Sequence, residues 1–446
     1  MRIRSAFVLS SCLFAFTSPP VRAGNWPSFR GPNGRGIGDG RPPIEWDVES
    51  GEHVKWKSSI PGQGHSSPIL WGDRIFLTTA VSADKSSPEF KTGWLDGTGE
   101  SAADEGPWTW KVLCLNKKDG RLVWQRDAHT GIPKSKRHIK ATYANSTPAT
   151  DGTHVVAFFG SEGLYCYDVE GELLWKKDLG LLKSGPYNAE DLEWGSANSP
   201  IIHDGQVILQ CDAMNNAFWA SFDVKTGREL RRVKRVDITT WSTPSIAESG
   251  GRTQVVCNGY KEMAGYDLKT GERLWTLHGG GDCPVPTPQV VGDMIYLTNG
   301  HGRSPIYAIR ADARGDLTPT DEVALPEGLA WCQPKNGSYM PTPLVLDKNL
   351  YVASDNGILA AYDAKTGKQL YRERIKGAGT FSASIVAADD RLYFVNEAGD
   401  VFVFQAGDSF KLLASNSMNE ICLATPAIAD GQIFIRGRDH LYCIGD

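Results

Sequence analysis

The sequence has few of the short motifs by which catalytic and metal sites are recognised. Its nine cysteines include no adjacent pair and no CxxC or CxxCH spacing, which excludes a thiol-redox motif and an attached c-type haem. The nine histidines are scattered singly, without HExxH, and no Gly-x-Ser-x-Gly nucleophile turn occurs. The formal charge of −5 comes with no basic stripe, so a nucleic-acid partner is excluded as well.

Long apolar runs are also lacking, and the one near the N-terminus is short. Arg2 and Arg4 precede the apolar-leaning residues 6–16, and Val21-Arg22-Ala23 has the small-x-small form of a cleavage site. About eleven such residues are too few to span a bilayer. We therefore expect residues 1–23 to be a signal peptide.

The mature chain is then residues 24–446, which we expect to be exported to the periplasm or cell envelope as a monomer without a transmembrane segment. The alternative is a lipid anchor at Cys12, because Leu9-Ser10-Ser11-Cys12 resembles a lipoprotein box. Of the other eight cysteines, Cys114, Cys166 and Cys443 occupy the same slot in three sequence copies. Repetition at a strand-interior slot indicates small buried fillers rather than ligands.

What the sequence does have is a repeat. Each copy reads small residue, Ser/Thr and Pro, an apolar run, an Asp/Gly turn, a second apolar run, Thr-Gly and a large ring. The cleanest copy runs from Pro244 through Asp267 and Gly271 to Trp275. Short β-runs repeated at this length are typical of a propeller, in which each sheet buries its faces against its neighbours.

The register marks of the repeat count its units. They fall at Pro68, Pro148, Pro200, Pro244, Pro288, Pro343, Ser384 (in place of Pro) and Pro426. Most gaps fit the roughly 40–50 residues of a four-stranded blade. The sequence therefore predicts an all-β, eight-bladed propeller of antiparallel blades, which forms one domain over residues 24–446.

The eighth unit is incomplete, since it lacks the stretch that ends in Trp elsewhere. Residues 47–51 followed by Val54-Lys55-Trp56 supply that stretch at the other end of the chain. We expect this N-terminal strand to complete the last blade and close the ring, which removes exposed sheet edges.

Large rings close the copies and are predicted to pack between blades, where each buries about 150–250 Å². They are Trp56, Trp124, Trp175, Trp275 and Tyr371.

The repeat resembles the pyrroloquinoline-quinone-type eight-bladed propeller, whose blades carry Ala-x-Asp-x-x-Thr-Gly-x-x-x-Trp. Residues 361–371 match this motif with Tyr371 in place of Trp, and Asp267 to Trp275 matches with Gly265 at the Ala position. Asp223 to Arg231 keeps Asp and Thr-Gly but ends in Arg. The family has a quinoprotein dehydrogenase branch and a non-enzymatic, BamB-like branch. Residues 26–31, Trp-Pro-Ser-Phe-Arg-Gly, also resemble secreted propellers of planctomycete-like bacteria.

The dehydrogenase branch implies pyrroloquinoline quinone on a Trp floor, a ring of two adjacent disulfide-bonded cysteines, and Ca²⁺ held by Glu and Asn beside a catalytic Asp. The sequence has no adjacent cysteine pair, and no segment of it matches the Glu, Asn and Asp residues that hold Ca²⁺ in that branch. Trp241 is a floor candidate, or a ring that packs at the channel mouth. We expect no catalytic residue, no metal and no cofactor, with the quinone and Ca²⁺ as the alternative.

Two other segments have chemistry to consider. The acidic insertion Asp96-Gly97-Thr98-Gly99-Glu100, with Asp104 and Glu105, is suited to a hard cation, but a solvated loop is the favoured interpretation. The insertion over residues 82–109 is expected to interrupt two strands of the first blade and to project over one mouth of the channel.

The predicted partner face is this channel mouth, because the segments that enter each innermost strand line it. Loops on a rigid scaffold often carry function, and exposed aromatic rings suit binding. The alternative is that several rings only plug the axis. The candidate residues are His65, Trp94, Trp108, Trp110, Tyr143, Asn145, Trp194, Asn198, Trp241, Tyr339 and Phe381.

These patterns favour a secreted, non-catalytic scaffold that binds an envelope or extracellular protein, peptide or polymer through the channel mouth. A divergent quinoprotein alcohol or sugar dehydrogenase and a carbohydrate-binding propeller are the two other hypotheses.

Overall fold

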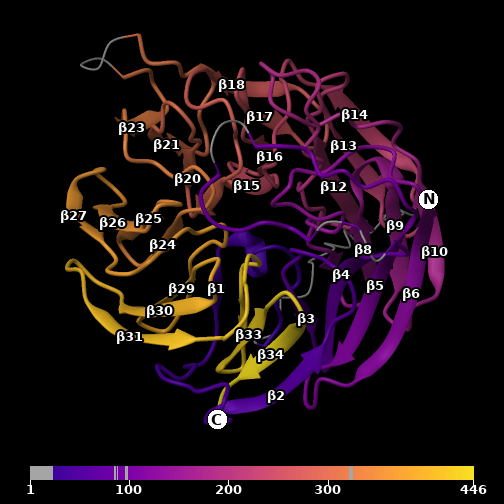
Figure 1. Ribbon diagram of the computed structural model, residues 1–446. Helices are drawn as coiled ribbons and strands as arrows, with labels where there is room; N and C mark the ends of the chain where they lie inside the picture. Colours follow the sequence, from indigo (N-terminus) through magenta and orange to yellow (C-terminus); the bar gives the residue numbers. More distant parts are fainter. Residues whose placement is uncertain (1–23, 85–86, 88, 96–98, 321–324) are drawn as a thin grey trace, which may run out of the picture.

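Eight β-sheets stand in a ring around a central axis in the computed structural model (Figure 1). The structure describes residues 24–84, 87, 89–95, 99–320 and 325–446, so the expected signal peptide and Cys12 lie outside the described residues. Each sheet has four antiparallel strands, and two sheets carry a fifth strand in parallel. The eight-bladed propeller predicted from the repeat is confirmed.

Each blade begins with a short strand beside the axis. These innermost strands are β3 (Ile69–Trp71), β7 (Ala149–Thr150), β11 (Ile201–His203), β15 (Ser245–Ser249), β19 (Gln289–Val291), β24 (Leu344–Leu346), β28 (Val386–Ala388) and β32 (Ala427–Ala429). The second strands are β4 (Arg74–Ser82), β8 (His154–Phe158), β12 (Gln206–Cys211), β16 (Arg252–Cys257), β20 (Met294–Thr298), β25 (Asn349–Ala353), β29 (Arg391–Val395) and β33 (Gln432–Arg436).

The third strands are β5 (Trp108–Asn116), β9 (Leu164–Asp168), β13 (Phe218–Asp223), β17 (Met263–Asp267), β21 (Ile306–Arg310), β26 (Ile358–Asp363), β30 (Asp400–Gln405) and β34 (His440–Ile444). The outermost strands are β6 (Leu122–Gly131), β10 (Leu173–Lys177), β14 (Glu229–Lys234), β18 (Arg273–Leu277), β23 (Leu329–Gln333), β27 (Gln369–Arg374), β31 (Leu412–Ser417) and β2 (Val54–Ser59). The remaining elements are β1 (Ile37–Gly38), β22 (Gly315–Asp316) and the 3₁₀ turns η1 (Pro32–Gly34) and η2 (Gly160–Glu162).

Burial follows the position of the strand within its blade. The middle strands are buried on both faces, as in β8 and β33, whereas outermost strands such as β14 have only exposed and half-buried residues. Turn chemistry fixes the hairpins that join the inner strands. Asp204 and Gly205 both have positive φ, 46° and 69°, as a tight turn between β11 and β12 requires.

The ring is closed by pairing the two ends of the chain (Figure 1). Strand β2 lies antiparallel to β34, with Val54 opposite Ile444 and Ser59 opposite His440. This is the predicted closure, and it gives the last blade its outermost strand.

The outer parts of the blades are joined by repeated contacts of one kind, which we call the docking ring. The indole N–H of a Trp in one blade donates to a carbonyl in the turn of the next: Trp56 to Lys117 at 2.9 Å, Trp124 to Val169 at 3.0 Å, Trp175 to Val224 at 2.7 Å and Trp331 to Ala364 at 2.9 Å.

Each Trp side chain of the docking ring also covers the glycine of the Thr-Gly-type turn in the next blade. Gly227, for example, has φ +67°, and a Cβ there would lie 2.6 Å from the indole of Trp175. Glycine is therefore needed twice over, for its conformation and for the close approach of the ring. Trp331 was missed from sequence because its blade lacks the Thr-Gly spacing.

Four of the eight blade junctions depart from this rule, and in three of these four the side chain at the Trp position makes a different contact. Arg231 takes the Trp position and donates to the carbonyls of Thr270 and Lys269. Trp275 donates instead to Gln254 of its own blade, because β22 lies beside its strand. Tyr371 packs edge-on against Phe410 of the next blade, with ring centroids 6.0 Å apart.

The insertion in the first blade is shorter than predicted. Strand β4 continues to Ser82 and β5 starts at Trp108, so the insertion comprises residues 83–107. These bounds differ from the expected 82–109 by one residue at the start and two at the end. Trp108 and Trp110 belong to β5 and face its buried side, because alternate strand residues point the same way.

The segment that precedes the first blade runs back into the ring and plugs its axis (Figure 1). Arg30 is completely buried and donates to the carbonyls of Ile385 at 2.7 Å and Pro343 at 2.9 Å. Strand β1 then pairs in parallel with β28. In the described part of the chain, none of the helical turns has the length and apolar character that crossing a membrane requires.

Candidate channel-mouth site

A ring of hydroxyl groups surrounds the axis where the innermost strands begin. One residue per blade contributes, namely Ser67, Thr147, Ser199, Thr243, Thr287, Thr342, Ser384 and Thr425. Six of them donate their backbone N–H to the hydroxyl oxygen of the next blade, at 2.9–3.1 Å. The Ser/Thr-Pro phrase of the repeat is therefore a connection between neighbouring blades.

Two members of this hydroxyl ring accept no such bond. Within the described residues, the buried hydroxyl oxygens of Ser67 and Thr287 have no hydrogen-bond partner. These residues stand four blades apart, on opposite sides of the axis, and they mark the two breaks in the ring. Buried hydroxyls without partners are uncommon in folded proteins.

Above the hydroxyl ring lies a cavity of about 780 Å³, and Phe29 of the plug lines it from below. Its size falls within the range of about 300–1,000 Å³ that is typical of ligand sites. All eight blades contribute lining residues, because each supplies its hydroxyl to the cavity floor.

The insertion closes part of the mouth. The backbone N–H of Gly93 donates to Glu397 Oε2 at 2.7 Å, which bridges from the first blade to the seventh. Lys140 Nζ donates both to the Gly93 carbonyl at 2.8 Å and to Glu397 Oε1 at 2.7 Å, and Ser382 donates to the same carboxylate at 2.6 Å. We call this group the Glu397 clamp.

The clamp is electrostatically favourable although it is buried. Burial opposes the ionisation of Glu397, but the charge of Lys140 and the hydrogen bonds from Lys140, Ser382 and Gly93 hold its pKa below the usual value. The neighbouring imidazoles are neutral. Burial lowers the pKa of His65 and of His138 to about 4.

A second connection holds the insertion to the blades. Asp104 and Arg137 form an ion pair of 2.8 Å, and both side chains are completely buried. The guanidinium lies 5.8 Å from the ring centroids of Trp108 and Tyr143, so the two rings enclose it. Asp104 is therefore structural and does not belong to a solvated loop, while residues 96–98 lie outside the described residues.

Aromatic rings form one wall of the cavity. Trp194 and Trp241 lie 5.7 Å apart between centroids, and His138 packs edge-on against Trp194 at 5.0 Å. Trp94 of the insertion is 70% exposed and Tyr187 is 43% exposed. The wall thus offers large apolar rings to an occupant.

The charged side chains that line the cavity are Lys140 and the three carboxylates Asp282, Asp355 and Glu397. Glu397 is neutralised by Lys140, which leaves two carboxylates and a formal charge of −2. Desolvation raises the pKa of Asp355. The cavity therefore favours a cationic group over an anionic one.

Seven of the eleven residues predicted for the partner face line this cavity. They are His65, Trp94, Asn145, Trp194, Trp241, Tyr339 and Phe381. Phe381 is itself buried and stacks on Phe394 at 3.9 Å.

The other four predicted face residues do not line the cavity. Trp108 and Tyr143 enclose Arg137, and the indole of Trp110 donates to the Tyr143 carbonyl at 3.1 Å. Asn198 is buried and donates to the carbonyls of Thr240 and Ser242, which ties two crossover segments together. Their role here is to hold the mouth in shape.

Sequence reasoning missed Phe29, Lys140, Asp282, His301 and Glu397. For Phe29 a signal was available in the sequence, because this residue belongs to the Trp-Pro-Ser-Phe-Arg-Gly segment of residues 26–31. The other four stand in loops whose mutual approach depends on the closed ring, and no local pattern marks them.

The residues present do not fit a calcium-bound quinone. Hard cations such as Ca²⁺ take six to eight oxygen ligands. Within the described residues, the one group of three or more metal-ligating side chains is Asp282, Cys283 and His301, which offers one oxygen, one sulfur and one nitrogen. No disulfide links the eight cysteines of the described chain, and hydroxyls and Phe29 form the floor.

Comparison with known proteins agrees with this architecture. A family model described as outer membrane protein assembly factor BamB matches residues 109–372 and 329–440. The BamB of Shewanella oneidensis is 25% identical over 368 residues, which cover 80% of this chain and 78% of that protein.

Two solved structures share the fold. BamB of Moraxella catarrhalis is similar over 82% of this chain and 96% of its own, with a TM-score of 0.51 and 13% identity. A europium-containing methanol dehydrogenase is similar over 94% of this chain and 90% of its own, with a TM-score of 0.61 and 10% identity. The matched residues, the repeat and the closed ring of eight blades thus agree: the chain belongs to the BamB family of pyrroloquinoline-quinone-like propellers.

Proposed function

We propose that this chain is a binding protein of the cell envelope whose channel mouth receives a segment of an envelope protein, peptide or polymer. The observation that carries the proposal is the cavity of about 780 Å³, which is roofed in part by an insertion and walled by aromatic rings. The similarity to BamB, an outer membrane assembly factor by name, supports an exported location and a protein partner.

The chemistry of the cavity supports an occupant of a particular kind. Exposed Trp94 and Tyr187 suit the apolar part of a side chain, and such rings are enriched where binding energy concentrates. The carboxylates of Asp282 and Asp355 suit a Lys or Arg side chain. We therefore propose a basic, extended segment as the preferred ligand.

Site-specific photo-cross-linking in the intact envelope tests this proposal. A benzophenone amino acid at position 94 should yield adducts, whereas the same group at position 173 should not. Leu173 is a matched control because it is 50% exposed and lies at the opposite end of its blade. Trp241→Ala should reduce adducts at position 94. Equal adducts from both positions would contradict a binding site at the mouth.

A carbohydrate is the second candidate, favoured by the same exposed rings above a floor of hydroxyls. A glycan array probed with the wild type and with Trp94→Ala distinguishes the two ligands. Glycan binding that depends on Trp94 would indicate that the ligand is a sugar rather than a protein.

The dehydrogenase hypothesis has a direct test as well. Pyrroloquinoline quinone and Ca²⁺ added at tens of micromolar should leave the absorbance of the protein unchanged, because the donor set does not suit them. A bound-quinone spectrum with dye-linked alcohol oxidation would replace the binding function with a redox one.

A further inference from the structure

Two short segments of the fifth blade meet at the cavity wall. Asp282 and Cys283 precede the innermost strand β19, and His301 follows the second strand β20. An isolated antiparallel bridge pairs Cys283 with Gly300, and a Cβ on Gly281 would lie 2.0 Å from the Gly300 carbonyl. Glycine at position 281 lets the two segments approach closely enough to bring their side chains together.

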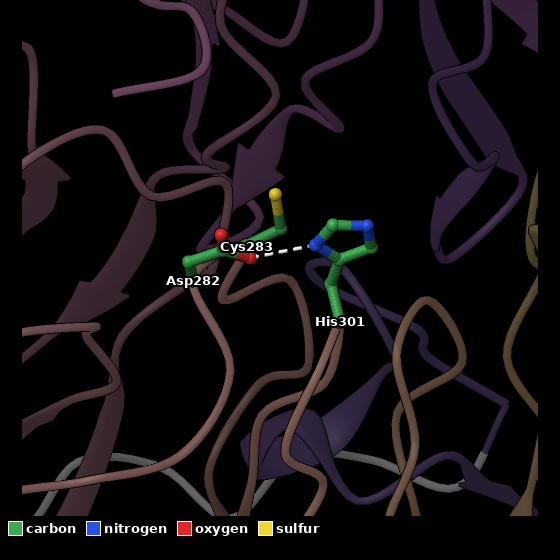
Figure 2. Close-up of side chains that lie close together, drawn as sticks. All are labelled: Asp282, Cys283 and His301. Carbon is green, nitrogen blue, oxygen red and sulfur yellow. Dashed lines mark hydrogen bonds and ion pairs between the residues drawn. The ribbon is translucent and has the colours of Figure 1, made fainter. Parts of the chain in front are cut away.

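Three side chains with metal-ligating atoms converge there (Figure 2). One carboxylate oxygen of Asp282, the sulfur of Cys283 and a ring nitrogen of His301 all lie within 4.8 Å of one another. Asp282 Oδ1 and His301 Nδ1 are 2.7 Å apart, and the line between them is drawn in Figure 2. All three residues line the cavity, so the cluster is open to whatever occupies it.

Burial of the three groups is graded in a way that suits an ion at the cavity surface. Cys283 is buried, the side chain of Asp282 is 22% exposed and that of His301 is 63% exposed. His301 has φ +75°, a left-handed conformation that is uncommon for residues other than glycine. The turn therefore holds the imidazole against the other two groups at some conformational cost.

The donor set selects a class of metal ion. Sulfur, nitrogen and a single carboxylate suit zinc and similar divalent transition metals, whereas Ca²⁺ and Mg²⁺ require oxygen. Three protein ligands with a fourth position open are typical of zinc sites that bind another molecule. The net negative charge of the cavity also favours a cation.

Only small movements are needed to form such a site. With zinc bonds of about 2.0–2.3 Å, tetrahedral ligand atoms stand roughly 3.3–3.8 Å apart. The thiol therefore needs to approach by no more than about 1.5 Å, while the Asp282–His301 hydrogen bond of 2.7 Å opens slightly. A thiol that coordinates a metal ion loses its proton to the solvent and binds as the thiolate.

Tyr339 lies behind the cluster. Its ring centroid is 5.7 Å from that of His301, and its hydroxyl is close enough to the Cys283 thiol to influence the pKa of both groups. A polar group beside a ligating sulfur orients it and tunes its bond to the metal. The surroundings of the cluster thus resemble a supported ligand set rather than three unrelated side chains.

We propose that Asp282, Cys283 and His301 bind a zinc-type divalent cation, with an open coordination position that faces the channel-mouth cavity. A donor group of the cavity's occupant, such as a carboxylate or an imidazole, would take that position. The site does not depend on the proposed partner, because metal binding needs no occupant.

Cobalt(II) is the probe for this site, because tetrahedral cobalt with a thiolate ligand has visible bands and a charge-transfer band in the near ultraviolet. The mature chain, reduced and stripped of metal with a chelator, should bind one equivalent of cobalt with both bands, and zinc should displace it. Cys283→Ser should abolish the charge-transfer band. His301→Ala, a change at an exposed side chain, should weaken binding at least about 10-fold.

Matched controls keep the test specific. Cys332→Ser changes a half-buried cysteine on β23 of the same blade, and His278→Ala changes an exposed histidine of the preceding blade. Both should leave the cobalt spectrum and affinity unchanged, and circular dichroism should show that every variant is folded. Absence of the thiolate band in the wild type, or its persistence in Cys283→Ser, would overturn the proposal. Cobalt binding without cross-links at position 94 would support the metal site and contradict the proposed binding function.

Discussion

The docking ring and the channel mouth are built by opposite means. In the docking ring, one contact recurs at four blade junctions, with an indole N–H on the next carbonyl and a glycine beneath the ring. Apart from the hydroxyl ring, the contacts made by the insertion and by the plug each occur once and join residues far apart in the chain, such as Gly93 with Glu397 and Arg30 with Ile385. The difference shows that the repeat provides the scaffold and the floor of the cavity, while the unrepeated segments add its plug and its partial roof.

The largest expected effect falls on the docking ring. Trp175→Ala removes a nearly buried indole and its hydrogen bond to Val224, which should lower the free energy of unfolding by about 3–5 kcal/mol. Urea unfolding of Trp175→Ala and of the adjacent, exposed Leu174→Ala measures the difference. A loss that is equal in the two variants would mean that the indole does not join the blades.

The mouth should respond to a similar change locally rather than globally. Asp104→Asn leaves the buried Arg137 without its carboxylate, at a cost of about 3 kcal/mol or more. Because Asp104 belongs to the insertion, hydrogen exchange should accelerate at the described residues 99–107 and remain slow in β10 and β13. Uniform acceleration across all blades would show that the insertion is part of the global folding unit.

The hydroxyl ring contains its own matched pair. Thr342→Val leaves the backbone N–H of Thr287 buried without an acceptor, which should cost about 1–3 kcal/mol. Thr287→Val removes a hydroxyl oxygen that accepts no bond and should change stability by less than about 0.5 kcal/mol. Urea unfolding of the two variants side by side distinguishes them, and equal losses would contradict the two breaks in the ring.

The same contrast explains what could be predicted from the sequence. The blade count, the closure by Val54–Ser59 and the positions of Trp124 and Trp175 follow from a periodic signal, because every blade solves the same packing problem. The Asp104–Arg137 pair had no such signal, since one partner lies in an insertion that no other blade has. Trp108 was predicted to lie at the mouth because it was counted as part of the first-blade insertion, yet it belongs to a strand whose alternation turns it inward.

The cavity contacts were beyond sequence reasoning for a geometric reason. Glu397 meets Gly93 only after the ring has closed, and the two are separated by 304 positions. Asp282 and His301 likewise required the bridge between Cys283 and Gly300, which is not part of the repeat. Candidate residues that belong to the repeated mouth segments, such as Trp194 and Trp241, line the cavity, and their role in binding stays a prediction.

A fall in pH is the change with the smallest expected effect, and it should weaken the mouth but not the docking ring. Titratable groups hold the mouth together, whereas hydrogen bonds from indoles to backbone carbonyls hold the docking ring. Glu397 has a lowered pKa in the folded protein, so its contribution to stability is present above its unfolded pKa, near 4.5, and is lost as the pH falls through the folded value. His65 contributes to stability over a higher pH range. Its folded pKa of about 4 lies below 6.5, so stability is lost as the pH falls from about 6.5 towards 4.

Hydrogen exchange at Gly93, corrected for the intrinsic rate, should therefore accelerate in two steps as the pH falls from 7 to 3. Glu397→Gln should remove the lower step, and His65→Gln should reduce the upper one, which His138 shares because its pKa is lowered over the same range. The strands beside Trp175 should keep their protection throughout. If Gly93 and β10 lost protection together, acid would be unfolding the whole ring. The mouth and the docking ring would then share one stability, and the insertion could not open to an occupant while the blades remain closed.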